Sequence, residues 1–165
     1  MAPAVDVERE FAEYFAARGQ ALRRTAYALC GDWHLAEDLV QSTFVRLYRN
    51  WRRIRQPTID AYARRTLLNL FLSGRRTASR EQVVSEVPER AAAAAGSEER
   101  IDLARALARL SPRQRAMVVL RYLEDLPVAE VAELVGVAEG TVKSQTARGV
   151  AALRTVLRDH ALSVR

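Results

Sequence analysis

Residues 126–150 read LPVAEVAELVGVAEGTVKSQTARGV, and their spacing predicts a helix-turn-helix. This motif needs a small residue where its helices cross, a glycine in the turn four residues later, and an apolar anchor six residues further on. Ala132, Gly136 and Val142 occupy these positions. If Val142 faces inward, five side chains face outward where the motif reaches bases and phosphates: Thr141, Lys143, Ser144, Ala147 and Arg148. An ordinary helical hairpin with a glycine turn is the alternative.

Helical patterns also precede this motif. The apolar residues of 101–110 predict a short amphipathic helix, and Ser111 to Gln114 has the layout of a capping box with proline at the first helical position. In the first half of the chain, Gly31 is expected to end one helix and Asp32 to cap the next. The buried stripe expected on that next helix is Leu35, Ala36, Leu39, Val40, Thr43, Phe44 and Leu47.

A third helix is expected to begin near Pro57 or Thr58 and to end at about Arg76. No strand-like alternation competes with these patterns, so the sequence predicts an all-α fold. Residues 77–100 lack aromatics, contain a five-alanine tract and read as a flexible linker. We therefore expect two small helical domains, at 1–76 and 101–165.

Composition narrows the class of protein. The chain has 165 residues, 49% of them hydrophobic and 28% charged, which is typical of a globular protein. No apolar run approaches the length of a membrane span, so we expect no membrane insertion and a cytoplasmic location. A lone cysteine and two isolated histidines offer neither a disulfide framework nor metal-binding spacing, and we expect no metal and no cofactor.

The charge of +6 is unevenly distributed. Residues 46–76 carry nine arginines against Asp60 alone, whereas residues 1–45 have a net charge of −3. Such a basic block is typical of a surface that binds a polyanion, although a solvated helix face is the alternative. Trp51, Tyr48 and Tyr62 lie in or beside it and are candidates for stacking on an unpaired base, with Trp51 the best of them. For each ring taken alone, a place in the core is the commoner alternative.

A resemblance covers almost the whole chain. The runs DWHLAEDLVQ at 32–41 and LYRNW at 47–51, then Ala61-Tyr62, Asn69 and Arg75-Arg76, resemble region two of extracytoplasmic-function (group IV) RNA polymerase sigma factors. The runs LSPRQR at 110–115, LRY at 120–122 and GTVKSQ at 140–145 resemble region four, most closely in the sigma-E-type subgroup of actinobacteria. Pro127 and Ala138 stand where the family usually has capping serines.

The resemblance implies a promoter-specificity subunit that binds core RNA polymerase. Glu37, Asp38 and Gln41 would contact the β′ clamp helices. Region four would read the minus-thirty-five element as duplex DNA and contact the β flap. Single-stranded bases of the minus-ten element would be captured by Trp51, Arg52, Arg53, Arg55, Tyr62, Arg64, Arg65 and Asn69. Control by an anti-sigma factor, by transcription of its own gene or by proteolysis stays open.

Two other classes of protein compete with this interpretation. A helix-turn-helix repressor or activator would bind duplex DNA without polymerase, usually as a dimer. The aromatic and arginine-rich segment argues against it. A nucleic-acid enzyme would need carboxylates paired at metal spacing, and Glu37-Asp38 and Glu124-Asp125 read better as docking or capping charges. We therefore expect no catalysis by this chain itself.

Overall fold

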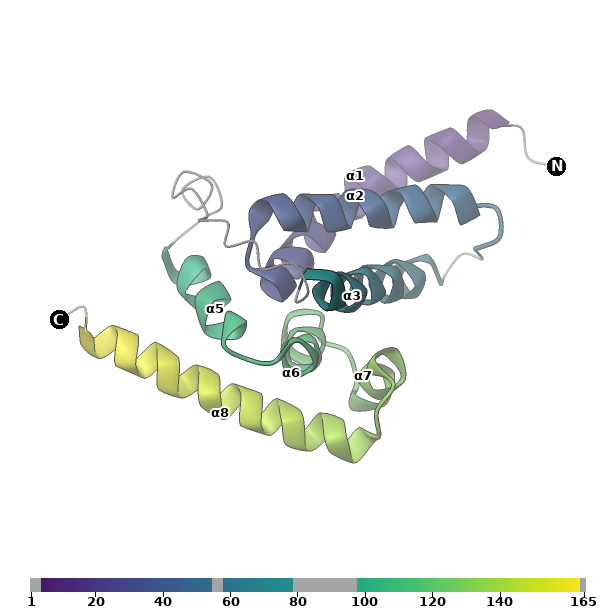
Figure 1. Cartoon of the computed structure of the whole chain (residues 1–165). Helices are drawn as coiled ribbons and strands as arrows, with labels where there is room; N and C mark the ends of the chain where they lie inside the picture. The colour runs from purple at the N-terminus through teal and green to yellow at the C-terminus, as the bar shows by residue number, and fades with distance from the viewer. Residues whose placement is uncertain (1–3, 55–57, 79–97, 164–165) are drawn as a thin grey trace.

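The computed structural model describes residues 4–54, 58–78 and 98–163, and these residues form helices and turns with no strand. This confirms the all-α prediction. In Figure 1, α1 to α3 form one bundle, and α5 to α8 form a second bundle beside it. The elements are α1 (Ala4–Cys30), α2 (Trp33–Asn50), α3 (Ile59–Ala78), α5 (Glu98–Ala108), α6 (Pro112–Val118), the π-helical turn η1 (Val119–Leu123), α7 (Val128–Val135) and α8 (Glu139–Ser163).

The junction between α1 and α2 forms as the sequence predicts. Gly31 adopts the left-handed conformation, with φ 71°, and its N–H donates to the carbonyl of Tyr27 at 2.7 Å. The Asp32 carboxylate then accepts from the backbone N–H groups of His34 and Leu35 at 2.8 and 3.2 Å. These contacts satisfy groups that a helix end leaves unpaired, and they reverse the chain so that α2 packs on α1.

The predicted stripe of α2 is buried with one exception. Ala36, Leu39, Val40, Thr43, Phe44 and Leu47 are all buried. Leu35 is 45% exposed, so its predicted burial was wrong. It lies in the first turn of α2, where it lines an open groove between the two bundles. A periodic pattern identifies a helix face, but it does not show how far along the helix a neighbour covers that face.

The second bundle also begins with a predicted cap. Ser111 Oγ accepts from the N–H of Gln114 at 3.3 Å, which is half of the expected capping box. The side chain of Gln114 does not return to Ser111; it donates to the carbonyl of Gln145 at 3.3 Å and to the Gln145 side chain at 3.2 Å, tying α6 to α8. Pro127 is the N-cap residue of α7 and makes no side-chain hydrogen bond to the helix, because its side chain has no polar group.

A buried arginine joins the two bundles. Arg115 of α6 is 1% exposed. Its guanidinium donates to the carbonyl of Leu29 at the end of α1, at 2.6 Å. It also donates to three carbonyls around the end of α5, those of Leu107, Ala108 and Leu110, at 2.8 to 3.1 Å. A helix end carries partial negative charge on its free carbonyls, which explains how this cation is stabilised away from water.

The expected domain limits differ slightly from the helix ends. α3 continues to Ala78, two residues past the expected end of the first domain, and α5 begins at Glu98, inside the expected linker. Most of that linker lies outside the described residues.

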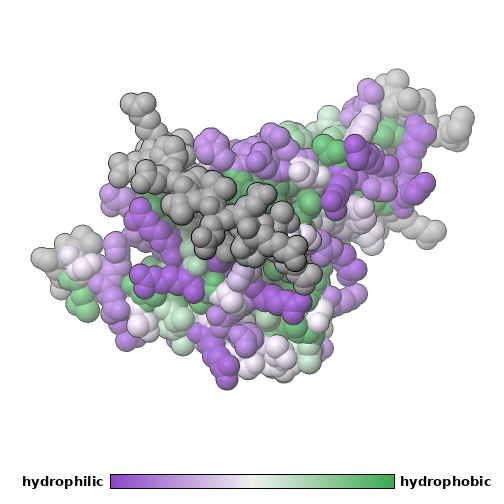
Figure 2. Space-filling model, in the orientation of Figure 1, coloured by the Kyte–Doolittle hydropathy of each residue, from purple (hydrophilic) through white to green (hydrophobic). Residues whose placement is uncertain are grey.

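In Figure 2, hydrophobic residues come to the surface near the middle of the molecule, among hydrophilic ones. Among the described helices, none is both long enough and apolar enough to cross a bilayer.

Candidate nucleic-acid interface

The helix-turn-helix has the geometry that its sequence predicts. Gly136 adopts φ 75° and ψ 41°, and its N–H donates to the carbonyl of Ala132 at 2.9 Å, which ends α7. A residue with a Cβ would be strained at this φ, so glycine suits the turn. Ala132 is buried and Val142 is completely buried, as the motif requires. Val142 therefore fixes the rotation of α8 about its own axis.

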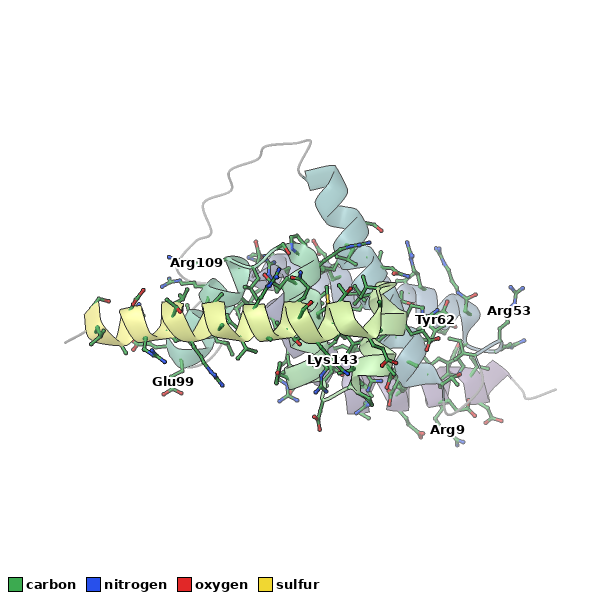
Figure 3. The ribbon with its side chains drawn as sticks, turned by 90° about the horizontal axis from the view of Figure 1, so that it is seen from below. Arg9, Arg53, Tyr62, Glu99, Arg109 and Lys143 are labelled. Carbon is green, nitrogen blue, oxygen red and sulfur yellow. The ribbon has the colours of Figure 1, made fainter. Side chains whose placement is uncertain are left out.

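This rotation exposes the predicted reading face of α8. All five candidates are exposed: Thr141, Lys143, Ser144, Ala147 and Arg148. Within the described residues no ion pair engages Lys143 or Arg148, and Lys143 projects from the near side of α8 in Figure 3. The face thus offers two cations, two hydroxyls and a methyl group, which suit phosphates, base edges and the methyl of thymine respectively.

Trp51 lies in the core and not on the surface. It is 5% exposed and packs edge to face against Phe11, with ring centroids 5.4 Å apart. Tyr14 covers it as well at 5.6 Å, and its indole N–H donates to Glu10 at 3.4 Å. Of the two alternatives for Trp51, this structure shows the core position, with the ring covered and not exposed for stacking on a base. The first half of α1 supplies the cover, and aromatics at positions 11 and 14, on one helix face, were the signal for it.

The other residues predicted to bind single-stranded DNA divide into two groups. Arg52 and Arg53 are exposed beyond the end of α2, and Tyr62 is half-buried on α3 (Figure 3). Asn69 is exposed further along α3, and Arg55 lies outside the described residues. Arg64 and Arg65 form the second group, because both are engaged by carboxylates of the other bundle.

These interdomain ion pairs were not predicted from the sequence. Arg64 Nε lies 2.9 Å from Glu124 Oε2, and its Nη1 lies 3.9 Å from Glu130. Arg65 Nη2 lies 3.7 Å from Glu133. The sequence signal is weak, because the partners are about 60 residues apart and separated by the linker.

Asp60 fixes the start of α3 against α1. Its carboxylate accepts from Tyr14 Oη at 2.9 Å, and from Arg18 Nε at 3.0 Å and Nη2 at 2.5 Å. Partial burial acts to raise the pKa of Asp60, but the hydrogen bonds from Arg18 and Tyr14 outweigh it and hold the pKa below its usual value. Burial, together with the hydrogen bond to Asp60, raises the pKa of Tyr14. This network holds the start of α3, within the basic block, against α1.

We expect Asp60→Asn to reduce the free energy of unfolding at pH 7, because it removes the anion that Arg18 and Tyr14 bind. A carboxyl whose pKa is lower when folded stabilises the protein fully above its unfolded pKa, and this effect is lost as the pH falls through the folded value. The difference between wild type and variant should therefore shrink below about pH 4 in urea unfolding. Asp159→Asn, at an exposed site, is the control. A difference that stays constant down to acid pH would contradict a role for the charge.

The predicted polymerase-docking residues lie on the outer face of α2. Asp38 and Gln41 are exposed. Glu37 is partly exposed and forms an ion pair with Arg23 of α1, at 2.6 Å. The capping of α2 by Asp32 sets the first turns of the helix, from which all three side chains project.

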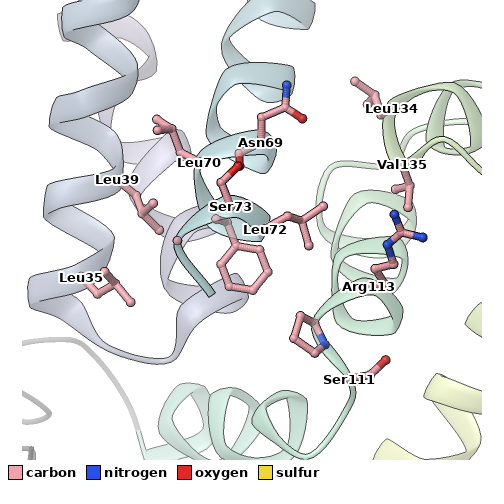
Figure 4. A pocket seen from close by; sticks show the side chains of 13 residues that line it. Leu35, Leu39, Asn69, Leu70, Leu72, Ser73, Ser111, Arg113, Leu134 and Val135 are labelled. Atoms are coloured by element: carbon pink, nitrogen blue, oxygen red, sulfur yellow. The ribbon is translucent and has the colours of Figure 1, made fainter. Parts of the chain in front are cut away.

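A groove of about 1170 Å³ lies between the bundles (Figure 4). Leu35 and Leu39 line it from α2, and residues 69–74 line it from α3. From the other side it is lined by residues 111–113 and by Leu134 and Val135 of α7. Its walls are mainly apolar, with polar groups at Asn69, Ser73, Ser111 and Arg113, so an amphipathic helix matches its chemistry.

Comparison with known proteins identifies both bundles. Residues 14–81 match the family model for sigma-70 region 2, and residues 100–153 match that for sigma-70 region 4. RNA polymerase sigma-E factor of Streptomyces avermitilis is 37% identical over 160 residues, covering 94% of this chain and 89% of that protein. ECF RNA polymerase sigma factor SigL of Mycobacterium tuberculosis is 34% identical, covering 84% and 83%.

The fold agrees with a solved relative. The sigma factor RpoE of Bartonella quintana, in complex with the anti-sigma factor NepR, superposes with a TM-score of 0.75 at 28% identity, covering 91% of this chain and 98% of that chain. Region 2 precedes region 4 along the chain, and relatives of similar length match most of it. Both findings indicate the same family. The chain belongs to the extracytoplasmic-function sigma factors of RNA polymerase.

Proposed function

We propose that α8 reads the minus-thirty-five element while the surface formed by the end of α2 and by α3 captures the minus-ten element. As a sigma factor, the chain acts in promoter recognition and transcription initiation with RNA polymerase. The observation that carries the proposal is the burial of Val142, which turns the five candidate side chains toward solvent at the start of α8. Helix-turn-helix proteins place these positions in the major groove.

On the minus-ten side, we assign phosphate contacts to the arginines and base stacking to Tyr62. Arg52 and Arg53 are exposed and carry charges that suit a DNA backbone. Arg64, Arg65 and Asn69 extend the surface along α3, and Arg55 belongs to the same assignment. Trp51 supports this surface from the core, because its ring is covered by Phe11 and Tyr14.

We assign polymerase docking to Glu37, Asp38 and Gln41, which would contact the β′ clamp helices, while region four contacts the β flap. These three residues lie in the first turns of α2, whereas the proposed DNA surface lies at the end of α2 and along α3. Polymerase and DNA would therefore contact different parts of the same bundle. The polymerase supplies the chemical step, and this chain supplies recognition and strand opening. This work takes place in the cytoplasm, where polymerase and chromosome are located.

Run-off transcription tests this function. Transcription start sites are mapped after expression of the chain, and the promoter found is transcribed with core RNA polymerase in the presence and absence of the purified chain. We expect a promoter-dependent product only when the chain is present, and co-elution of the chain with core polymerase in gel filtration. A repressor or activator that acts without polymerase gives neither result. Absence of both would reject the proposed function.

We also propose that an anti-sigma factor docks in the groove between the bundles through the apolar face of an amphipathic helix. The groove has leucines on both walls and one cation, Arg113, at its edge. The Bartonella quintana relative, which shares the fold, was solved with an anti-sigma factor, and this supports the class of partner.

We expect Leu35→Asp combined with Leu134→Asp to weaken binding of the cognate anti-sigma factor by roughly tenfold or more, since each change places a charge against the apolar helix. Isothermal titration calorimetry measures the dissociation constant. Leu103→Asp, at an exposed leucine outside the groove, is the control and should leave binding unchanged. Equal affinity of the groove variant and the wild type would place the partner elsewhere.

A further inference from the structure

The acidic residues of region four are concentrated where they face α3. Residues 122–142 contain five acidic side chains and no lysine, arginine or histidine. This segment includes α7, which lies opposite α3, and α3 belongs to the block with a net charge of +8. The most acidic part of region four therefore meets the most basic part of region two.

The contact between them is specific and partly buried. The side chains of Arg64 and Glu124 are only 18% and 17% exposed, and they are joined at 2.9 Å. The Thr25 hydroxyl of α1 donates to the other oxygen of Glu124, so both carboxylate oxygens are bound. Glu130 adds a second, longer ion pair to Arg64, and Glu133 pairs with Arg65 at 3.7 Å, where both side chains are exposed. Exposed ion pairs contribute little, but a partly buried, hydrogen-bonded pair is costly to break on one side.

The backbone between η1 and α7 holds Glu124 in a position where its side chain reaches Arg64. The turn η1 places the N–H of Glu124 on the carbonyl of Val119 at 3.1 Å. Asp125 then adopts φ 54°, which reverses the chain directly after Glu124. Arg121 holds this reversal by donating to the carbonyl of Leu126 at 2.5 Å. The backbone position of Glu124 is thus fixed by hydrogen bonds and by the turn on either side of it.

A guanidinium group binds carboxylates and phosphates with the same donor geometry, so one arginine cannot serve both fully at once. We propose that the free chain is held closed by an acidic latch, consisting of Glu124, Glu130 and Glu133, that occupies Arg64 and Arg65 in place of DNA phosphates. The latch rests on the proposed function of α3 as a DNA-binding surface. Opening the two regions releases both arginines, so the single-stranded DNA surface is complete only in the open chain.

The test uses the full chain with all three latch glutamates replaced: Glu124→Gln, Glu130→Gln and Glu133→Gln. A control variant removes three exposed carboxylates outside the contact, Glu8→Gln, Glu13→Gln and Glu99→Gln, and so changes the net charge equally. Dyes at Ala12→Cys and Ala152→Cys, both exposed, report the separation of the regions by energy transfer in a Cys30→Ser background. Fluorescence anisotropy measures binding to an oligothymidine of about 20 nucleotides, which probes stacking and phosphate contacts without sequence preference.

We expect energy transfer to fall and oligothymidine to bind about five- to tenfold more tightly in the latch variant alone, because binding improves with the population of the competent form. Unchanged energy transfer in the latch variant would overturn the latch. An equal gain in oligothymidine affinity in the control variant would overturn it as well, because the gain would then come from the change in net charge. Reduced energy transfer with unchanged DNA binding would overturn the masking and remove Arg64 and Arg65 from the minus-ten surface. Run-off transcription by the wild-type chain tests the proposed function independently of all these results.

Discussion

Replacing Lys143 and Arg148 together by alanine should lower promoter-dependent transcription by at least about 30-fold. Each side chain is exposed on the face of α8 that Val142 turns to solvent, and neither is engaged in an ion pair among the described residues. Loss of a base or phosphate contact costs about 1–3 kcal/mol, so two losses amount to at least about 2 kcal/mol, which corresponds to roughly 30-fold. Run-off transcription with subsaturating holoenzyme measures the effect.

Salt dependence separates phosphate contacts from base contacts in the same experiment. Each phosphate contact contributes about 0.9 to the slope of log affinity against log salt concentration. We expect the slope of the double variant to fall by about one to two. Arg154→Ala with Arg158→Ala removes the same charge from exposed positions further along α8 and should change transcription little. Equal losses in both double variants would show that the net charge of α8, and not its reading face, is responsible.

Replacing Arg115 by methionine should lower the free energy of unfolding by about 3–5 kcal/mol. Methionine fills much of the same apolar space but donates no hydrogen bond, so the carbonyls of Leu29, Ala108 and Leu110 lose this donor. The carbonyl of Leu107 loses it too but keeps the N–H of Leu110. An unsatisfied buried polar group costs about 1–3 kcal/mol, and the costs at Leu29, Ala108 and Leu110 are not fully additive because they share one side chain. A change of this size is a large part of the total stability of a small protein.

Chemical denaturation followed by circular dichroism measures the Arg115 effect. Arg113→Met makes the same chemical change two residues earlier, at an exposed position, and should alter the free energy of unfolding by less than about 0.5 kcal/mol. A loss below about 1 kcal/mol in Arg115→Met would mean that water replaces the guanidinium at these carbonyls. Arg115 would then not be the main link between the end of α1 and the second bundle.

Features set by neighbouring residues were predictable. The helix ends at Gly31 and Gly136, and the caps at Asp32 and Ser111, depend on local conformation and on hydrogen bonds within a few residues. The outward direction of the five candidates on α8 followed from the three-point spacing of the helix-turn-helix. These predictions needed no knowledge of how the two halves of the chain meet.

Features set by tertiary contact were not predictable. The sequence places Trp51 next to a polar, arginine-rich segment, and only the packing of Phe11 and Tyr14 over its ring shows that it is buried. Leu35 belongs to an apolar stripe, yet among the described residues its side chain stays 45% exposed in the first turn of α2. The pairs of Arg64 and Arg65 with carboxylates of region four require the relative position of two bundles, about which periodicity and charge counts carry no information.

The groove between the bundles has a consequence beyond the shape of its occupant. Its walls belong to both regions, so a helix seated there contacts Leu35 and Leu134 together only while the regions remain in contact. Binding to the groove and closure of the chain must then favour each other by the same factor, as any two linked equilibria do. An occupant of the groove can therefore act as a heterotropic inhibitor, blocking promoter binding without covering the reading face of α8.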